Sequence, residues 1–407
     1  MDISIQKSKL KSFKKIKITG SKSESNRLLL LQALYPEIAI ENVSNSDDSV
    51  LMKKALESDE TIIDIHHAGT AMRFLTAYLS IQQGEKVVIT GSSRMKERPI
   101  KILVEALRTL GADITYIEND GFPPLRITGK KLKRNKVTLE ANVSSQYISA
   151  LLLIASKLDK GLELTLNGKI TSVPYIKMTL SLLNDLGIET SFNKNTIKVN
   201  AEKTKLTKQT ITVESDWSSA SYFYSVIALS NIGTEITISS YKKESLQGDS
   251  VLADIYLKFG VATYYDANSI RLVKEEKTQS THLEFHLSDA PDIAQTIAVS
   301  AFGLGVECYM TGLHTLKIKE TDRLVALKTE LEKLGATIDI TLDTLRVNAS
   351  DSIKSKVAID TYNDHRMAMA FAPLGLKTEL TIKNADVVSK SYPQFWKDFS
   401  AIGFKLK

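Results

Sequence analysis

The chain has 407 residues, which corresponds to two or three domains at about 150 residues per domain. Apolar residues make up 43% of it and charged residues 25%, an ordinary globular composition that excludes a mainly disordered chain. The net charge of +6 is too small and too dispersed to indicate a nucleic-acid binder, but it is compatible with anionic small molecules. A single cysteine, Cys308, excludes a disulfide scaffold and a cysteine-based zinc site.

The chain is predicted to have neither a targeting segment nor a membrane span. Its lysine-rich start, residues 1–18, has no apolar core and therefore does not form a signal peptide. The longest uncharged apolar stretch near mid-chain, residues 147–156, is too short to cross a bilayer. We therefore expect a soluble cytoplasmic protein with no membrane or nucleic-acid partner.

One pattern recurs along the chain: apolar residues at helical spacing, then a glycine, then two alternating stretches separated by a turn. The copies cover residues 101–127, 177–199, 249–272, 323–347 and, truncated, 394–407. Their glycines, expected at helix C-termini, follow one another at intervals of 68 to 76 residues (Gly111, Gly187, Gly260, Gly335 and Gly403). A further helix after Asp48 fits one more copy upstream. This spacing predicts an α/β fold of repeated units, although helix–glycine–strand sequences are also common in unrelated α/β proteins.

A polar, lysine-rich stretch, residues 201–212, is the best candidate for a domain boundary. Three repeated units would lie on either side of it. The sequence therefore predicts two similar domains.

A second kind of segment lies between the repeats: a short polar cluster that leads into an apolar helix. The clusters are residues 20–27, 67–73, 144–146, 216–221, 289–292, 319–323 and 363–366. Each is explained most simply as a helix N-cap. Ordinary caps, however, favour acidic residues in the first turn, whereas six cations crowd these helix starts (Lys22, Arg27, Arg73, Lys319, Arg323 and Arg366). Bound phosphates or carboxylates would explain why the cations are tolerated.

Other chemical motifs are absent. Residues 20–26 lack the second glycine and the Gly-Lys-Ser/Thr order of a phosphate-binding P-loop, and no dinucleotide-binding glycine pattern follows a predicted strand. The one adjacent histidine pair, His66 and His67, is expected on a strand with its side chains pointing apart, which argues against a metal site. Cys308 lies in an apolar run, which predicts an inert buried thiol.

Six motifs in order resemble the 5-enolpyruvylshikimate-3-phosphate synthase (3-phosphoshikimate 1-carboxyvinyltransferase) family. They are residues 20–27, 68–73, 94–100, 144–146, 319–323 and 363–369, and the resemblance runs from about Lys22 to Lys390. It implies two similar domains, 21–213 and 1–20 plus 214–407, each of three βαβαββ repeats in an inside-out α/β barrel. The ligands would bind in the interdomain cleft, which closes on substrate.

The resemblance also implies a reaction. The enolpyruvyl (carboxyvinyl) group of phosphoenolpyruvate would pass to the 5-hydroxyl of shikimate 3-phosphate and phosphate would leave, on the shikimate pathway to chorismate and the aromatic amino acids. No metal or organic cofactor is implied, and glyphosate targets the family. Both substrates are polyanions, so a closed site rich in lysine and arginine suits the chemistry. We expect a monomer.

Residue roles follow from the same resemblance. Phosphoenolpyruvate would bind Lys22, Gly69, Arg98, Gln146, Arg323, Arg366 and Lys390. Shikimate 3-phosphate would bind Lys22, Ser23, Arg27, Ser144, Ser145, Gln146, Ser172, Asp292 and Lys319, with Tyr175 lining the pocket. Asp292 would take the proton of the attacking hydroxyl, and Glu320 would protonate the methylene carbon, with help from Lys22 or Lys390.

Each acid also has a purely structural explanation. Asp292 could be an N-cap beside Pro291, and Glu320 could form an i,i+3 ion pair with Arg323, which is compatible with catalysis.

Three positions depart from the family pattern: His67 replaces the usual Asn or Asp, Thr315 the usual Asn, and Thr19 the usual Pro. Three other functions remain open. A UDP-N-acetylglucosamine enolpyruvyl transferase would share the fold but usually relies on a loop cysteine. A non-catalytic anion-binding relic would lack Asp292, Glu320 or Lys22. A structural repeat protein would have surface-like composition at its helix starts.

Overall fold

The computed structural model describes residues 1–10, 14–140, 144–168, 170, 173–202, 207–278 and 280–407. The chain divides into two compact units: unit 1 is residues 1–19 with 214–407, and unit 2 is residues 20–213. Each unit has its own hydrophobic core, and no buried apolar residue is shared between the two cores in the described chain. The stretch 201–212, predicted as the boundary, contains strand β12 of unit 2, and the chain leaves that unit just after it, between Val213 and Glu214.

Unit 2 is one continuous segment between the two parts of unit 1. Its elements are α1 (Lys22–Leu34), β3 (Ile38–Glu41), α2 (Asp47–Leu56), β4 (Ile62–Asp64), α3 (Gly69–Ser80), β5 (Lys86–Thr90), α4 (Ser93–Lys96), α5 (Lys101–Leu110), β6 (Asp113–Tyr116), β7 (Leu125–Thr128), β8 (Lys136–Glu140), α6 (Ser145–Ala155), β9 (Leu162–Asn167), α7 (Val173–Asp185), β10 (Thr190–Asn193), β11 (Thr196–Val199) and β12 (Gln209–Thr212).

Unit 1 is built from the first nineteen residues and the second half of the chain. Its elements are β1 (Ile3–Gln6), β2 (Lys14–Lys17), α8 (Trp217–Ala228), β13 (Glu235–Ser239), η1 (Gly248–Val251), α9 (Leu252–Leu257), β14 (Val261–Asp266), β15 (Ser269–Lys274), β16 (His282–His286), η2 (Pro291–Ile293), α10 (Ala294–Leu304), β17 (Glu307–Thr311), η3 (His314–Ile318), α11 (Arg323–Lys333), β18 (Ile338–Ile340), β19 (Leu345–Val347), β20 (Val357–Ile359), α12 (His365–Phe371), η4 (Ala372–Leu376), β21 (Leu380–Ile382), η5 (Ala385–Lys390), α13 (Phe395–Ile402) and β22 (Lys405–Leu406).

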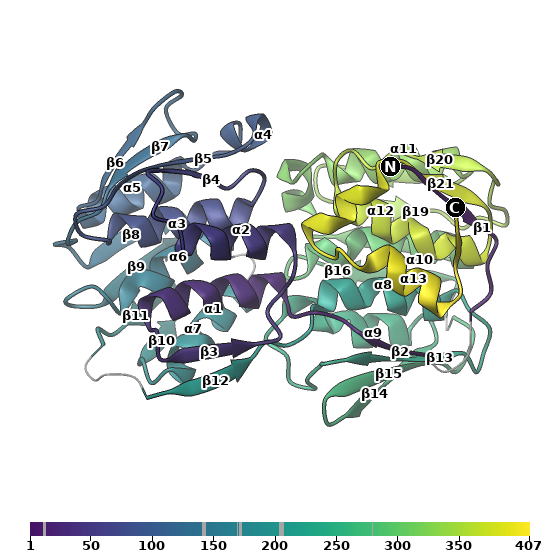
Figure 1. Ribbon diagram of the computed structural model, residues 1–407. Coiled ribbons are helices and arrows are strands. Elements are labelled where there is room, and N and C mark those ends of the chain that lie inside the picture. The colour runs from purple at the N-terminus through teal and green to yellow at the C-terminus, as the bar shows by residue number, and fades with distance from the viewer. Residues whose placement is uncertain (11–13, 141–143, 169, 171–172, 203–206, 279) are drawn as a thin grey trace. The chain divides into compact units, whose positions relative to one another are not determined.

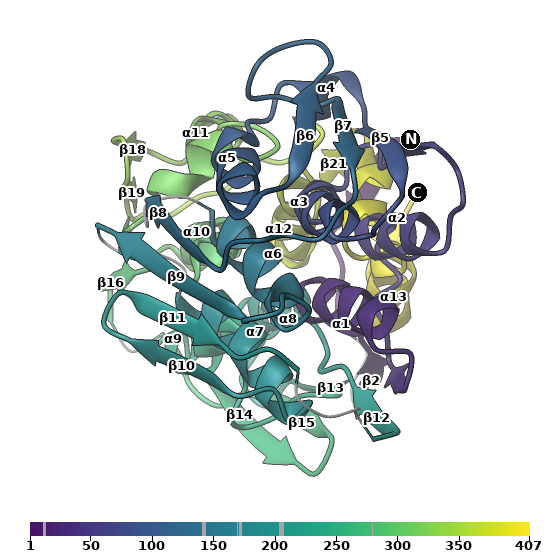
Figure 2. The same ribbon diagram turned by 90° about the vertical axis from the view of Figure 1, so that its left-hand side faces the viewer.

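The predicted repeat is confirmed by the sheet topology. Five four-stranded sheets share one arrangement, a parallel pair followed by two antiparallel neighbours: β4-β5-β7-β6, β8-β9-β11-β10, β2-β13-β15-β14, β16-β17-β19-β18 and β20-β21-β1-β22. Figure 2 shows the strands of the second of these sheets side by side. The five predicted glycines all have positive φ after a helix, which confirms the predicted helix C-termini.

Two copies depart from the simple repeat. The truncated last copy is completed from the other end of the chain, because β22 pairs with β1, which also pairs with β21. The copy that contains α1 and α2 has only the parallel pair β12-β3. Within the described residues it has no hairpin, since β4 of the next copy follows α2 after a short loop.

The two helices of a repeat play different parts. The first helices (α1, α3, α6, α8, α10 and α12) are buried over most of their length, and the three sheets of each unit lie around its helices (Figure 1). In α6, SQYISALLLIA, every residue but Gln146 is buried, as expected for a helix that is apolar all round. The second helices bury one stripe only, as in α5 with Leu103, Leu107 and Leu110. Six of the seven predicted polar clusters therefore lie at the start of one of these buried first helices.

No helix in the described part of the chain is both long and apolar enough to span a membrane.

Candidate functional site

In unit 2 the N-terminal halves of four helices meet. Arg27 of α1 donates to Ser149 of α6 (2.9 Å) and to Thr179 of α7 (2.8 Å). Gln146, at the start of α6, donates to the hydroxyl of Thr70 in the first turn of α3 (3.2 Å). The positive ends of α1, α3, α6 and α7 are thus gathered in one region, an arrangement that favours anions.

Arg27 is held within the protein by neutral groups. Its guanidinium also donates to the carbonyls of Ser23 (2.6 Å) and Tyr175 (3.3 Å), and it lies over the rings of Phe74 and Tyr175. Only 2% of Arg27 is exposed, and this burial lowers its pKa to about 10. The structure therefore gives Arg27 the role of a tie between α1, α6 and α7, and its role toward a ligand stays a prediction.

Arg98 lies against the start of α3. A Cβ atom built on Gly69 would come within 2.5 Å of the Arg98 Nη1 atom, so only glycine permits this close approach. The Arg98 side chain and that of Lys22, the first residue of α1, have no hydrogen-bond or ion-pair partner in the described part of the chain. Two half-buried cations without a partner carboxylate fit a binding site for anionic ligands.

The predicted serines of unit 2 lie at the same helix starts. Ser144 caps α6 through the backbone N–H of Gln146, Ser145 is buried in its first turn, and Ser23 belongs to the first turn of α1. Ser172 lies outside the described residues. Tyr175 lies in the first turn of α7, where its carbonyl accepts from Arg27.

In unit 1 three carboxylates surround Arg323, which begins α11. The guanidinium donates to Asp364 (2.6 Å), to Asp292 (2.7 Å) and to Glu320 (2.9 Å), and Arg323 is 2% exposed. Burial opposes its charge, but the carboxylates of Asp364, Glu320 and Asp292 outweigh burial and hold the pKa of Arg323 above its usual range. The two predicted acid–base residues, Asp292 and Glu320, therefore both accept hydrogen bonds from Arg323.

Asp292 is in contact with two more predicted site residues. Its carboxylate lies 3.3 Å from the Lys319 ammonium and 3.2 Å from the Arg366 guanidinium, which also donates to the Asp292 carbonyl (3.1 Å). Asp292 lies in η2, where Ala290 and not Asp292 occupies the N-cap position, so the structural explanation for Asp292 is wrong. The i,i+3 ion pair between Glu320 and Arg323 does form.

Arg366 is also connected to Asp249 through the hydroxyl of Ser218. Its guanidinium donates to the hydroxyl of Ser218 (3.3 Å), which itself donates to the carboxylate of Asp249. Asp249 is 2% exposed, and burial together with repulsion by Asp292 raises its pKa to about 6. The first turns of α8, α11 and α12 thus meet around Asp292.

Two further residues of unit 1, Lys390 and Thr315, lie next to segments that carry the cluster around Asp292. Lys390, at the end of η5, donates to the carbonyl of Asn363, which immediately precedes the N-cap of α12 (2.6 Å). Thr315, a departure from the family pattern, lies in η3, and its buried hydroxyl has no hydrogen-bond partner in the described chain.

The histidine pair differs from the prediction. His66 and His67 lie in a turn and not on a strand; His66 has a φ of 48°, and the two Nδ1 atoms are 2.8 Å apart. The turn brings the rings together because successive side chains point apart only in extended backbone. Among the described residues no group of three or more histidine, cysteine or acidic side chains could hold a metal ion.

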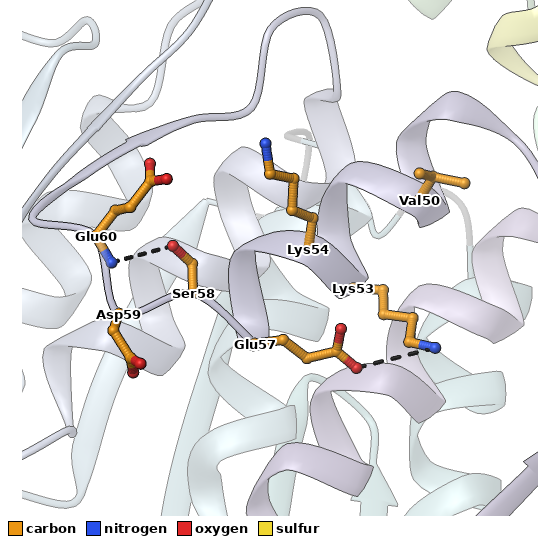
Figure 3. A pocket seen from close by; sticks show the side chains of 7 residues that line it. All are labelled: Val50, Lys53, Lys54, Glu57, Ser58, Asp59 and Glu60. Carbon is orange, nitrogen blue, oxygen red and sulfur yellow. Dashed lines mark hydrogen bonds and ion pairs between the residues drawn. The ribbon is translucent and has the colours of Figure 1, made fainter.

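Two further features lie apart from the predicted site. Cys308 is fully buried in β17, and burial raises its pKa to about 12, which confirms the inert thiol. A surface hollow of about 780 Å³ at the C-terminal end of α2 is lined by none of the predicted site residues (Figure 3). Its lining is Val50, Lys53, Lys54, Glu57, Ser58, Asp59 and Glu60.

The sequence did not indicate every residue of these clusters. Asp364 stood in a recognised motif, but only the fold shows that its carboxylate binds Arg323. Ser218 stood in a predicted helix-start cluster, whereas Asp249 carried no local signal. Thr70, which binds Gln146, could have been suspected as a first-turn hydroxyl in its motif.

Comparisons with known proteins agree on one family. The sequence model of the family described as EPSP synthase (3-phosphoshikimate 1-carboxyvinyltransferase) matches residues 53–399. A relative from Bacteroides fragilis named 3-phosphoshikimate 1-carboxyvinyltransferase is 46% identical over 397 residues, which cover 96% of each chain. A relative of the same name from Haemophilus influenzae is 35% identical over 422 residues, with the same coverage.

Solved structures share the fold. An EPSP synthase from Acinetobacter baumannii superposes with a TM-score of 0.81 at 21% identity, covering 100% of this chain and 99% of the other. The enolpyruvyl transferase NikO from Streptomyces tendae has a TM-score of 0.74 at 14% identity, with 100% and 98% covered. These likenesses confirm the predicted two-domain α/β class.

Proposed function

Because this chain belongs to the EPSP synthase family, it is an enzyme of carboxyvinyl transfer from phosphoenolpyruvate to shikimate 3-phosphate, and we propose how its residues divide the reaction. Unit 2 supplies cations, hydroxyls and helix N-termini that bind the two polyanions. Unit 1 supplies the two carboxylates that move protons. The observation that carries this proposal is the convergence of Asp292 and Glu320 on Arg323.

In unit 2, the cations without carboxylate partners bind the substrates. Arg98 and Lys22 bind phosphoenolpyruvate, with the Gly69 backbone close to it and the Gln146 amide beside it. Shikimate 3-phosphate binds the other groups at the helix starts together with Lys22 and Gln146, namely Ser23, Arg27, Ser144, Ser145 and Ser172. Hydroxyls and backbone N–H groups suit phosphate oxygens, and a bidentate guanidinium suits a phosphate or a carboxylate.

In unit 1, Asp292 accepts the proton of the 5-hydroxyl while the hydroxyl oxygen bonds to C2 of phosphoenolpyruvate. Glu320 donates a proton to the methylene carbon, so the double bond becomes a single bond and a tetrahedral intermediate forms. Glu320, now a carboxylate, then takes a proton from the methyl group while phosphate leaves C2 and the double bond is restored. Asp292 passes its proton to the departing phosphate, so both carboxyl groups return to their starting states. Arg323, Arg366 and Lys390 hold phosphoenolpyruvate, and Lys319 holds shikimate 3-phosphate.

Both units must act on the same pair of substrates. We propose that the units are the two three-repeat domains of the family, that the substrates bind in the cleft between them, and that this cleft closes on shikimate 3-phosphate. The radius of gyration from solution scattering should fall when shikimate 3-phosphate is added. An unchanged radius at saturating ligand would contradict closure. We also propose that the protein acts as a cytoplasmic monomer.

The direct test is a phosphate-release assay with phosphoenolpyruvate and shikimate 3-phosphate, run with and without EDTA. We expect release that depends on both substrates and is unaffected by EDTA. No release would overturn the functional proposal, and sensitivity to EDTA would overturn the proposed metal-free reaction. Replacing shikimate 3-phosphate by UDP-N-acetylglucosamine in the assay tests for the related transferase activity. The position of Cys308 argues against that activity, because the related family usually relies on a loop cysteine and Cys308 is buried in a strand.

A further inference from the structure

Arg73 is a buried cation for which the proposed reaction has no use. It lies in α3, it is 4% exposed, and its guanidinium donates to two backbone carbonyls, that of Gly69 (2.9 Å) and that of Pro99 (3.3 Å). Gly69 is the residue against which Arg98 lies, and Pro99 directly follows Arg98. Arg73 therefore binds the backbone on both sides of the contact between Gly69 and Arg98.

A tyrosine from a second helix reinforces this tie. Tyr147 of α6 donates its hydroxyl to the same Pro99 carbonyl (2.5 Å), and its ring lies 5.9 Å from the Arg73 guanidinium. The Pro99 carbonyl thus accepts from two side chains on two interior helices. Since Tyr147 follows Gln146, the tie also connects Arg98 to the start of α6.

The arrangement is costly for the folded protein. Burial and the neighbouring charge of Arg98 lower the pKa of Arg73 to about 10. No carboxylate lies within ion-pair distance of Arg73 in the described chain, and its buried Nε atom has no hydrogen-bond partner there. Two neighbouring guanidinium groups with no carboxylate of the described chain between them are expected only where their placement serves a purpose.

We infer that Arg73 is a positioning residue, which fixes the Gly69 and Pro99 backbone so that the Arg98 guanidinium is presented to phosphoenolpyruvate. The inference rests on the proposed role of Arg98. A guanidinium is required because its two Nη atoms reach two carbonyls at once, whereas a lysine ammonium is a single point charge on a flexible stem.

The test compares Arg73→Lys with a matched control, Arg108→Lys. Arg108 of α5 also donates to a backbone carbonyl, that of Ile114 (2.9 and 2.7 Å), and also lies over a tyrosine ring, that of Tyr116. The predicted site residue nearest to Arg108 in the sequence is Arg98, ten residues before it. Both variants keep the charge and lose guanidinium hydrogen bonds to the backbone. Because Arg108 is exposed whereas Arg73 is buried, the control reports on the Arg-to-Lys exchange itself, and the melting temperature of each variant reports on stability.

We expect Arg73→Lys to raise the KM for phosphoenolpyruvate about tenfold, the loss of roughly one charge-assisted hydrogen bond, with kcat and the KM for shikimate 3-phosphate changed less than threefold. Arg108→Lys should leave both KM values unchanged. Tyr147→Phe, which removes the second donor to Pro99, should give a smaller rise of the same kind and keeps the test open if Arg73→Lys does not fold.

An equal rise in both KM values, or a KM for phosphoenolpyruvate like that of Arg108→Lys, would overturn the positioning role. So would an unchanged KM in Tyr147→Phe if Arg73→Lys does not fold. Arg98→Lys distinguishes this failure from failure of the proposed function. If Arg98→Lys leaves the KM for phosphoenolpyruvate unchanged, the role of Arg98 itself is wrong.

Discussion

The candidate site cations of the two units have different kinds of hydrogen-bond partner. In unit 2, Arg27 and Arg73 donate to hydroxyls and carbonyls, and Lys22 and Arg98 have no partner in the described chain. In unit 1, Arg323 and Arg366 are paired with carboxylates, and Lys319 lies 3.3 Å from one. The candidate site cations of unit 2 therefore have no carboxylate partner in the described chain, whereas most of those in unit 1 pair with carboxylates of the same unit.

This difference separates binding from proton transfer. Cations without carboxylate partners add affinity for polyanions whether or not the reaction proceeds, so their loss raises KM. Carboxylates in an anion-binding site weaken binding of anionic substrates by like-charge repulsion, so their presence in unit 1 requires a chemical reason. Variants of the two unit 1 carboxylates, Asp292 and Glu320, should lower kcat, and variants of the unit 2 cations should raise KM.

The largest expected effect is that of Asp292→Asn or Glu320→Gln. Each amide keeps the shape of the side chain but cannot take up or deliver the proton, so kcat should fall by about 10² to 10⁴. Steady-state phosphate release measures kcat, and circular dichroism checks the fold. A near-normal kcat in both variants would break the division between the units, because the acids would then serve structure alone.

A smaller effect is expected for Gly69→Ala in unit 2. The new methyl group would stand 2.5 Å from the Arg98 Nη1 atom, and the guanidinium must move because it is the end of a flexible side chain. The KM for phosphoenolpyruvate should rise about tenfold, the loss of roughly one charge-assisted hydrogen bond, while kcat and the melting temperature stay close to wild type. Leu103→Ala, a core change in neighbouring α5, is the control: it should lower the melting temperature without raising this KM selectively.

Local patterns predicted the repeat well. Helical spacing followed by glycine depends on a few neighbouring residues, so the helices and their C-termini could be recognised in the sequence. The pairing of β22 with β1 could not, because it joins the two ends of the chain. The lack of a hairpin after α2 could not be predicted from the sequence either, because a single helix resembles the helix of a complete repeat whether or not strands follow it.

The sequence could name candidate site residues but not the contacts between them. The family resemblance named Asp292, Glu320 and Arg323 as candidates, yet the bonds between them join residues up to 31 positions apart and depend on the tertiary fold. Asp249 illustrates the limit: its sequence context is an ordinary helix start, and only the structure brings its carboxylate to Ser218 and Arg366.

The prediction for Asp249 concerns stability instead of catalysis and sharpens the comparison, because it tests whether unit 1 holds a carboxylate at the expense of stability. Its pKa is about 6 in the folded protein against an ordinary value of 3.8, owing to burial and then to Asp292. The folded state therefore keeps a proton between about pH 4 and 6 that the unfolded state has released. Stability from this group falls as the pH rises through that window and stays constant above it.

Asp249→Asn removes the titrating group, so its free energy of unfolding relative to wild type should increase between pH 4.5 and 7, by at most about 3 kcal/mol. Urea unfolding at several pH values measures this difference. Loss of the contact with Ser218 changes the free energy of unfolding of the variant by the same amount at every pH, so only the change of the difference with pH reports on the pKa of Asp249. Ser218→Ala is the control, because it keeps the carboxylate but removes a hydrogen bond that lowers its pKa, so the pH-dependent loss of stability should persist and extend to higher pH. A difference between Asp249→Asn and wild type that does not vary with pH would mean that Asp249 is ionised at no cost, and unit 1 would then be a balanced ion network with no strained acid.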